Sequence, residues 1–219
     1  MTRSPALVIF DCDGVLVDSE RLTVAIESRV LGELGWPMTP AEVVDRWMGK
    51  TSQAQLADLT EHLGAARARE FDELVTAELH EAFDRELTAV EGVEPLVDAL
   101  HDAGVATCVA SSGTHDRMRR TLGLTGLHAR FDGRIFSASE VEHGKPAPDL
   151  FLHTARSMGV DPRGCAVLED SVHGVRAGVA AGMTVYGFAG GLTPRAALTA
   201  AGATAFEQMA ELVPLLTRE

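Results

Sequence analysis

The chain is short of cysteine and of positive charge, and both shortages exclude classes of function. Its 219 residues include three cysteines, Cys12, Cys108 and Cys165, whose spacing matches neither a zinc site nor a disulfide framework. Lysine and arginine number 19 against 32 aspartate and glutamate residues, so the formal net charge is −13. A negative charge of this size argues against binding to nucleic acid and to anionic membrane surfaces.

Long apolar runs are missing too. The apolar run at residues 6–10 is too short for a signal peptide. The longest stretch without charge, residues 177–194, contains five glycines and predicts a helix end, a strand and a loop rather than a membrane span. Each cysteine lies in or beside an apolar run, which predicts a buried thiol. We therefore expect a cytoplasmic protein, with a monomer as the default.

Short apolar runs that alternate with helical periodicity predict the fold. Strands are expected at residues 6–10, 105–110, 134–136, 165–168 and 184–188. From residue 93 onward they alternate with helices, the last at residues 209–216, which indicates a parallel sheet. Residues 19–86 have helical apolar spacing and no convincing strand. We predict an α/β fold in which residues 1–18 and 88–219 form a Rossmann-like parallel sheet with helices on both faces, and residues 19–87 form an inserted all-helical cap domain.

The most informative motif is Asp11-Cys12-Asp13-Gly14, directly after the first predicted strand. Side chains two apart on a strand point the same way, so Asp11 and Asp13 project together while Cys12 points away. Two carboxylates this close do not both stay ionised without a cation or a shared proton. Ligands of open α/β sheets bind at this end of the strands. The motif alone also fits an ordinary strand end, because Asp and Gly often terminate strands.

Three further polar clusters follow or lie near predicted strand ends. They are Ser111-Ser112-Gly113, Lys145 within the segment 144–149, and Glu169-Asp170. Each has an ordinary alternative: a helix N-cap, a surface lysine, and acidic residues that favour a helix N-terminus. Because the carboxyl ends of parallel strands share one edge, all four clusters are expected to meet there. Carboxylates without thiolates suit Mg²⁺, and the ion together with Lys145 would offset most of the negative charge.

Four segments, at residues 8–20, 109–112, 144–151 and 168–171, resemble in order the four motifs of haloacid dehalogenase-superfamily phosphatases that carry a small helical cap. The resemblance implies that Asp11 is the nucleophile and that Asp13 is first the acid and then the base. It implies that Ser111 binds the transferring phosphoryl group, with Ser112 nearby, and that Lys145 offsets charge. The implied Mg²⁺ ligands are Asp11, Asp13 through its backbone carbonyl, and Asp170, with Glu169 bound directly or through water.

The segment 47–51 is similar to the substrate loop of that family's caps. Gly49, Lys50 and Thr51 are therefore candidate substrate-binding residues, although Lys50 also fits an ordinary surface turn. The eight histidines have no ligand spacing, and we expect them to be surface or structural residues. We also expect Asp149 to cap the helix that follows it. Arg117, Arg119 and Arg120 are expected to form one solvated helix face.

These observations favour a Mg²⁺-dependent phosphomonoesterase that hydrolyses a small phosphorylated metabolite, in particular a sugar phosphate, through an aspartyl-phosphate. The main alternative is a sugar phosphomutase. Related mutases carry a histidine and a lysine where this chain has Thr23 and Thr114, so both positions favour hydrolysis. A phosphonate hydrolase would need Lys50 as a Schiff base. A non-catalytic binding protein of the same fold usually lacks one of the motif acids. A haloacid dehalogenase lacks the acid at the position of Asp13.

Overall fold

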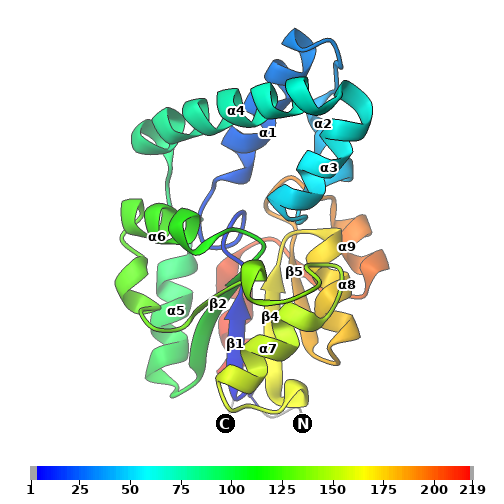
Figure 1. Ribbon diagram of the computed structural model, residues 1–219. Coiled ribbons are helices and arrows are strands. Elements are labelled where there is room, and N and C mark those ends of the chain that lie inside the picture. Colours follow the sequence, from blue (N-terminus) through cyan, green and yellow to red (C-terminus); the bar gives the residue numbers. More distant parts are fainter. Residues whose placement is uncertain (1–3, 218–219) are drawn as a thin grey trace.

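In the computed structural model, a parallel sheet carries helices on both faces and a helical cap lies above the carboxyl ends of its strands (Figure 1). The structure describes residues 4–217, so residues 1–3, just before the run considered as a signal peptide, lie outside it. The predicted α/β class and the helical cap are confirmed. The boundaries of the two domains stay a prediction. None of the helices in the described part of the chain combines the length and apolarity needed to cross a membrane.

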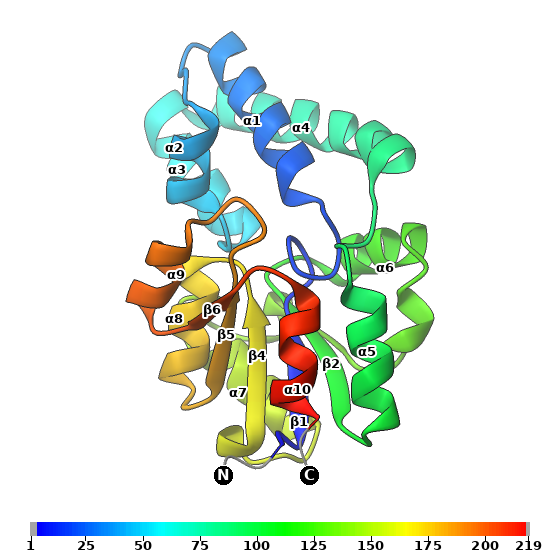
Figure 2. The same ribbon diagram turned by 180° about the vertical axis from the view of Figure 1, so that it is seen from behind.

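Six parallel strands form the sheet over residues 4–217, in the order β3-β2-β1-β4-β5-β6. They are β1 (Leu7–Phe10), β2 (Ala106–Ser111), β3 (Ile135–Ser137), β4 (Cys165–Glu169), β5 (Thr184–Phe188) and β6 (Thr204–Phe206). The first five match the apolar runs. Sequence reasoning missed β6, a three-residue edge strand visible from behind in Figure 2, because it is too short to carry a pattern.

The central strand β1 is buried on both faces, as parallel strands are. Val8 and Phe10 pack into one helical layer, while Leu7 and Ile9 pack into the other. The first layer contains α5 (Val93–Asp102), α6 (His115–Leu124), the 3₁₀ turn η4 (Met209–Leu212) and α10 (Val213–Leu216). The second layer contains α7 (Asp149–Ser157), α8 (Val172–Ala180) and α9 (Arg195–Ala201). Further 3₁₀ turns are η1 (His128–Arg130), η2 (Ala138–Glu140) and η3 (Pro162–Gly164).

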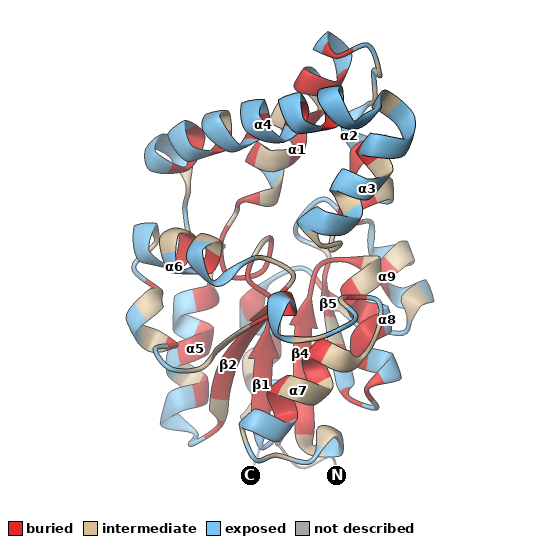
Figure 3. Ribbon diagram, in the orientation of Figure 1, coloured by how far each residue is buried: buried red, intermediate tan, exposed pale blue. Residues whose placement is uncertain are grey.

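The cap consists of four helices with a core of their own. They are α1 (Glu20–Glu33), α2 (Pro40–Trp47), α3 (Ser52–Leu63) and α4 (Ala65–Glu86). Trp47 and Phe71 pack edge to face in this core, at 6.0 Å between ring centroids. Figure 3 shows that the cap helices bury their inner sides and expose their outer ones. Thr39 forms a capping box with Glu42 at the start of α2.

Two passes of chain join the cap to the sheet and lie side by side. Val17 forms an antiparallel bridge with Ala89, and the amide of Asp18 donates to the carbonyl of Thr88. The two connections are therefore one paired unit rather than two loose linkers.

The expected cap at Asp149 is wrong: α7 begins at Asp149 itself, and its side chain makes no capping hydrogen bond.

Candidate active site

The polar clusters converge at the carboxyl ends of three adjacent strands. Asp11 follows β1, Ser111 ends β2, and Glu169 ends β4 with Asp170 directly after it. Because β1 pairs with β2 on one side and with β4 on the other, these residues share one edge of the sheet. The strand order changes direction at β1, the place where open α/β sheets bind their ligands.

Lys145 lies at the centre of this cluster and joins two of its carboxylates. Its side chain is 1% exposed, and Nζ lies 2.6 Å from Asp11 Oδ1 and 2.6 Å from Glu169 Oε1. The amide and the hydroxyl of Ser171 both donate to Glu169 Oε2, at 2.9 Å each. Both oxygens of Glu169 are therefore occupied within the protein. Burial lowers the pKa of Lys145, but Asp11 and Glu169 outweigh it and the net pKa is raised, so the amine is an ammonium.

Asp170 is the carboxyl group of the cluster that has a buried oxygen without a partner among the described residues. It is 2% exposed, and its buried Oδ2 accepts no hydrogen bond from the described residues. Burial and the neighbouring Glu169 raise its pKa well above the ordinary value. Gly14 makes room for this oxygen, since its backbone has φ +79° and any Cβ there would overlap Asp170 Oδ2. The space beside this oxygen is therefore kept open by the chain itself.

One carboxylate oxygen from each of Asp11, Glu169 and Asp170 lies within 4.8 Å of the other two. Burial raises the pKa of Asp11 to about 7, although Lys145 acts in the opposite direction. One ammonium does not balance three buried carboxyl groups. An oxygen-only donor set with one unpartnered oxygen fits a hard divalent cation such as Mg²⁺.

Asp13 is held by a different cation. Its Oδ1 accepts from Ser19 Oγ at 2.6 Å and from Arg117 Nη2 at 3.1 Å. Burial raises the pKa of Asp13, but Arg117 and Ser19 outweigh burial, so that its pKa lies below the ordinary value. Cys12 points away from the carboxylates, as expected, and its sulfur lies 3.8 Å from the hydroxyl of Thr121.

The expected solvated arginine face is wrong for two of its three members. Arg117 bonds Asp13, and its guanidinium lies 5.3 Å from the ring centroid of Phe83 on α4. Arg120 pairs with Asp84 of α4 at 2.7 Å, so α6 contacts the cap. Arg119 alone is solvated as expected, with a side chain that is 67% exposed. Sequence reasoning had one usable signal, namely that Arg117 lies in the first turn of a helix that starts beside Ser111.

The candidate substrate loop lies against the sheet. Ser112 Oγ donates to the carbonyl of Gly49 at 2.9 Å, and Thr51 caps α3 through the amide of Ala54. Lys50 is half-buried, lines the cavity between cap and sheet, and forms no ion pair in the described part of the chain. The loop therefore brings one uncommitted cation to the space above Asp11.

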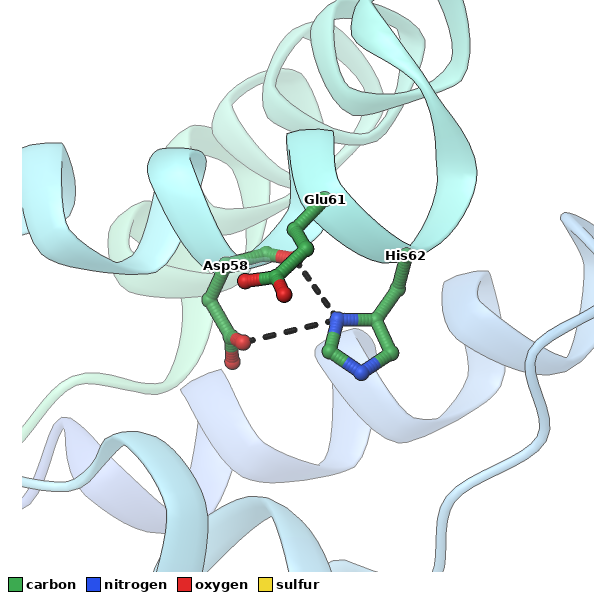
Figure 4. Close-up of side chains that lie close together, drawn as sticks. All are labelled: Asp58, Glu61 and His62. Carbon is green, nitrogen blue, oxygen red and sulfur yellow. Dashed lines mark hydrogen bonds and ion pairs between the residues drawn. The ribbon is translucent and has the colours of Figure 1, made fainter.

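A second acidic group, Asp58, Glu61 and His62 on α3, could hold an ion by distance alone (Figure 4). Its carboxylate at Asp58 is already taken: Arg46 donates two hydrogen bonds, at 2.6 and 2.8 Å, and Trp47 donates a third at 2.7 Å. His62 has the structural role expected of it, because its ring also stacks on Trp36. This group therefore stabilises the cap rather than forming a site.

Comparison with known proteins agrees with this geometry. Residues 8–188 match the family described as haloacid dehalogenase-like hydrolase. The 6-phosphogluconate phosphatase of Escherichia coli is 34% identical over 190 residues, 86% of this chain and 84% of that protein. A phosphorylated carbohydrates phosphatase of Thermotoga maritima is 31% identical over 95% of this chain and 97% of its own length.

A solved structure extends the comparison to the fold. A hydrolase of Deinococcus radiodurans, determined with bound phosphate and sodium, superposes with a TM-score of 0.76 at 33% identity and covers 99% of this chain and 100% of its own. The resemblance carried by the four sequence motifs is thus confirmed over almost the whole chain. The chain belongs to the haloacid dehalogenase-like hydrolases.

Proposed function

We propose that the protein is a Mg²⁺-dependent phosphomonoesterase that hydrolyses a small phosphorylated metabolite of the sugar phosphate class. The observation that carries the proposal is the buried cluster in which Lys145 bonds Asp11 while Asp170 keeps one oxygen unpartnered. The names of the relatives in Escherichia coli and Thermotoga maritima support the substrate class. The buried free cysteines support a cytoplasmic location, where thiols stay reduced. We propose a monomer.

Asp11 is the nucleophile in this proposal, and its attack on the phosphoryl group would give an aspartyl-phosphate. Lys145 favours the ionised form of the attacking carboxylate against burial and holds it in place through the bond at 2.6 Å. Asp13 would enter the reaction protonated, give that proton to the leaving alcohol and then take one from the attacking water. The negative charge of a bound phosphoryl group would favour this protonated form against the effect of Arg117. Ser111, which is 2% exposed, binds a phosphoryl oxygen at the end of β2. Ser112 fixes the loop that carries Gly49, Lys50 and Thr51 over the substrate.

The metal would be held by Asp11, Asp170 and the backbone carbonyl of Asp13. When bound, Mg²⁺ would screen the negative charge of the nucleophile from that of the phosphoryl group. Glu169 would not bind the metal directly, because its two oxygens accept hydrogen bonds from Lys145 and Ser171. Its role in this proposal is to hold the ammonium that faces Asp11.

The test measures phosphate release from sugar phosphates, polyol phosphates, phosphoglycolate, nucleotides and p-nitrophenyl phosphate, with Mg²⁺ and with a chelator. We expect Mg²⁺-dependent release, strongest for a few sugar or polyol phosphates. Asp11→Asn should abolish release and leave the circular dichroism spectrum unchanged. Asp116→Asn, which alters an exposed carboxylate on α6, is the matched control and should behave as the wild type. Near-normal turnover by Asp11→Asn would refute the mechanism.

The alternative hypothesis, a sugar phosphomutase, is tested in the same panel by following isomerisation of β-glucose 1-phosphate. Isomerisation without phosphate release would replace the proposal with a mutase. Thr114 speaks against that outcome, because its hydroxyl caps α6 by accepting from the amide of Arg117 at 3.3 Å. Thr23, at the other position, bonds the carbonyl of Ser19 within its own helix. Neither side chain supplies the cation or the imidazole that the mutases carry.

A further inference from the structure

The cavity between cap and sheet has two chemically different ends. Its volume is about 150 Å³. Asp11, Asp13 and Ser111 line it on the side of the sheet, and Glu27 and Gln55 line it from two cap helices. Sequence reasoning singled out neither of the last two residues. A phosphoryl group bound at Asp11 would leave the rest of the substrate facing them.

Glu27 is a buried carboxyl group with very little compensation. It is 6% exposed, and its one hydrogen bond in the described part of the chain comes from Gln55 Nε2 to Oε1, at 2.7 Å. Arg117 acts on it only through space, because that guanidinium bonds Asp13. Burial accordingly raises the pKa of Glu27 to about 7. The second oxygen, Oε2, accepts no hydrogen bond from residues 4–217.

Packing does not account for a carboxyl group at this position. The same cavity is lined by the apolar side chains of Val24, Val43 and Leu79. An apolar side chain at residue 27 would join them, and replacing buried polar pairs by apolar groups is often neutral or stabilising. A Glu that is held in place by an amide and faces a cavity instead suits a ligand that brings hydrogen-bond donors.

The chemistry of a carboxylate limits what this ligand is. An ionised carboxylate only accepts hydrogen bonds and has about four acceptor positions, of which Gln55 fills one. Neighbouring hydroxyl groups of a polyol donate to such a group from two carbons at once.

We propose, on the basis of the phosphatase function above, that Glu27, positioned by Gln55, is a specificity-determining residue that binds neighbouring hydroxyl groups of a sugar or polyol leaving group. The site thereby selects substrates with a hydroxylated leaving group over those with a bare one. The phosphoryl end is bound by the sheet and the hydroxylated end by α1 and α3.

The experiment compares kcat/KM for the best sugar or polyol phosphate, for its deoxy analogues that lack one hydroxyl each, and for p-nitrophenyl phosphate. In the wild type, one deoxy analogue should lose about 10- to 100-fold, the cost of a hydrogen bond to a charged group. In Glu27→Gln and Glu27→Leu, the ratio of kcat/KM for the parent compound to kcat/KM for that deoxy analogue should fall toward one. The parent sugar phosphate should lose far more than p-nitrophenyl phosphate, and mainly through KM.

The matched control is Glu33→Gln, which alters a carboxylate on the same helix that is 55% exposed and pairs with Arg29. It should retain the wild-type penalty for every analogue. An equal loss on all substrates, or an unchanged deoxy penalty in both Glu27 variants, would overturn the inference while leaving the phosphatase function intact. Absence of phosphate release from every compound in wild-type protein would overturn the proposed function and this inference with it.

Discussion

Glu27 should lower the stability of the protein at neutral and alkaline pH, and the variant Glu27→Gln should recover that loss. Burial raises the pKa of Glu27 from the ordinary 4.5 to about 7 in the folded protein. The folded state therefore binds this proton more tightly than the unfolded state does. Stability from this group is complete below pH 4.5 and is lost as pH rises through 7.

The magnitude follows from the size of the shift. At about 1.4 kcal/mol per pH unit, the raised pKa of Glu27 costs the folded protein about 3 kcal/mol above pH 8. Gln keeps the shape and an acceptor for Gln55 but has no charge to desolvate. Glu27→Gln should therefore be more stable than the wild type by about 1–3 kcal/mol at pH 8.5, and by about 1 kcal/mol or less at pH 5.

Urea unfolding followed by circular dichroism at the two pH values, with chelator in every sample, measures this difference. Glu33→Gln is again the control, since its exposed carboxylate should give the same small difference at both pH values. A Glu27→Gln variant that is less stable than the wild type at pH 8.5 would refute the reasoning. It would mean that the protein compensates Glu27 and that the carboxyl is part of the cap's packing.

Three further perturbations test other parts of the site. Lys145→Met leaves the carboxylates of Asp11 and Glu169 buried without a cation. It should abolish phosphate release and lower the free energy of unfolding, measured in urea, by about 3–5 kcal/mol. Gly49→Ala should raise KM at least several-fold with a smaller change in kcat, because φ is +79° and a Cβ would overlap Ser171 Oγ; an unchanged KM would contradict the contact. Asp58→Asn should lower stability by about 1–2 kcal/mol at pH 7, with the gap closing toward pH 2, since the hydrogen bond from an arginine holds the pKa of Asp58 at about 2 and its stabilisation is lost as pH falls through that value.

Local pattern was sufficient for most of the fold. The strands β1, β2, β4 and β5 are apolar runs bounded by turn residues, and such runs form buried strands in compact α/β proteins. The capping box at Thr39 also has a local cause, because both of its partners lie within four residues. The edge strand β6 was not, since three residues carry no periodicity and its pairing with β5 depends on the finished sheet.

The site divides in the same way between local and distant causes. Asp11, Lys145 and Asp170 belong to motifs that follow or lie near predicted strand ends. Because parallel strands end at one edge of the sheet, the convergence of these residues could be predicted from the sequence. Arg117 looked like a surface residue, because what buries it is Asp13, 104 residues away, together with Phe83 of the cap. Glu27 looked like an ordinary polar position on an amphipathic helix. Its burial appears only when α3 brings Gln55 against it.

The two ends of the cavity leave complementary gaps in their hydrogen bonding. At the sheet, Asp170 Oδ2 accepts no hydrogen bond from the described residues and lies beside carboxylates that a single ammonium does not balance. In our proposal a cation and an anionic phosphoryl group complete that end. At the cap, Glu27 Oε2 accepts no hydrogen bond from the described residues, and in our proposal neutral hydroxyl groups of the substrate complete that end. A molecule that fills both gaps must carry its charge at one end and its hydroxyl groups at the other. A phosphate monoester of a sugar or polyol has that polarity.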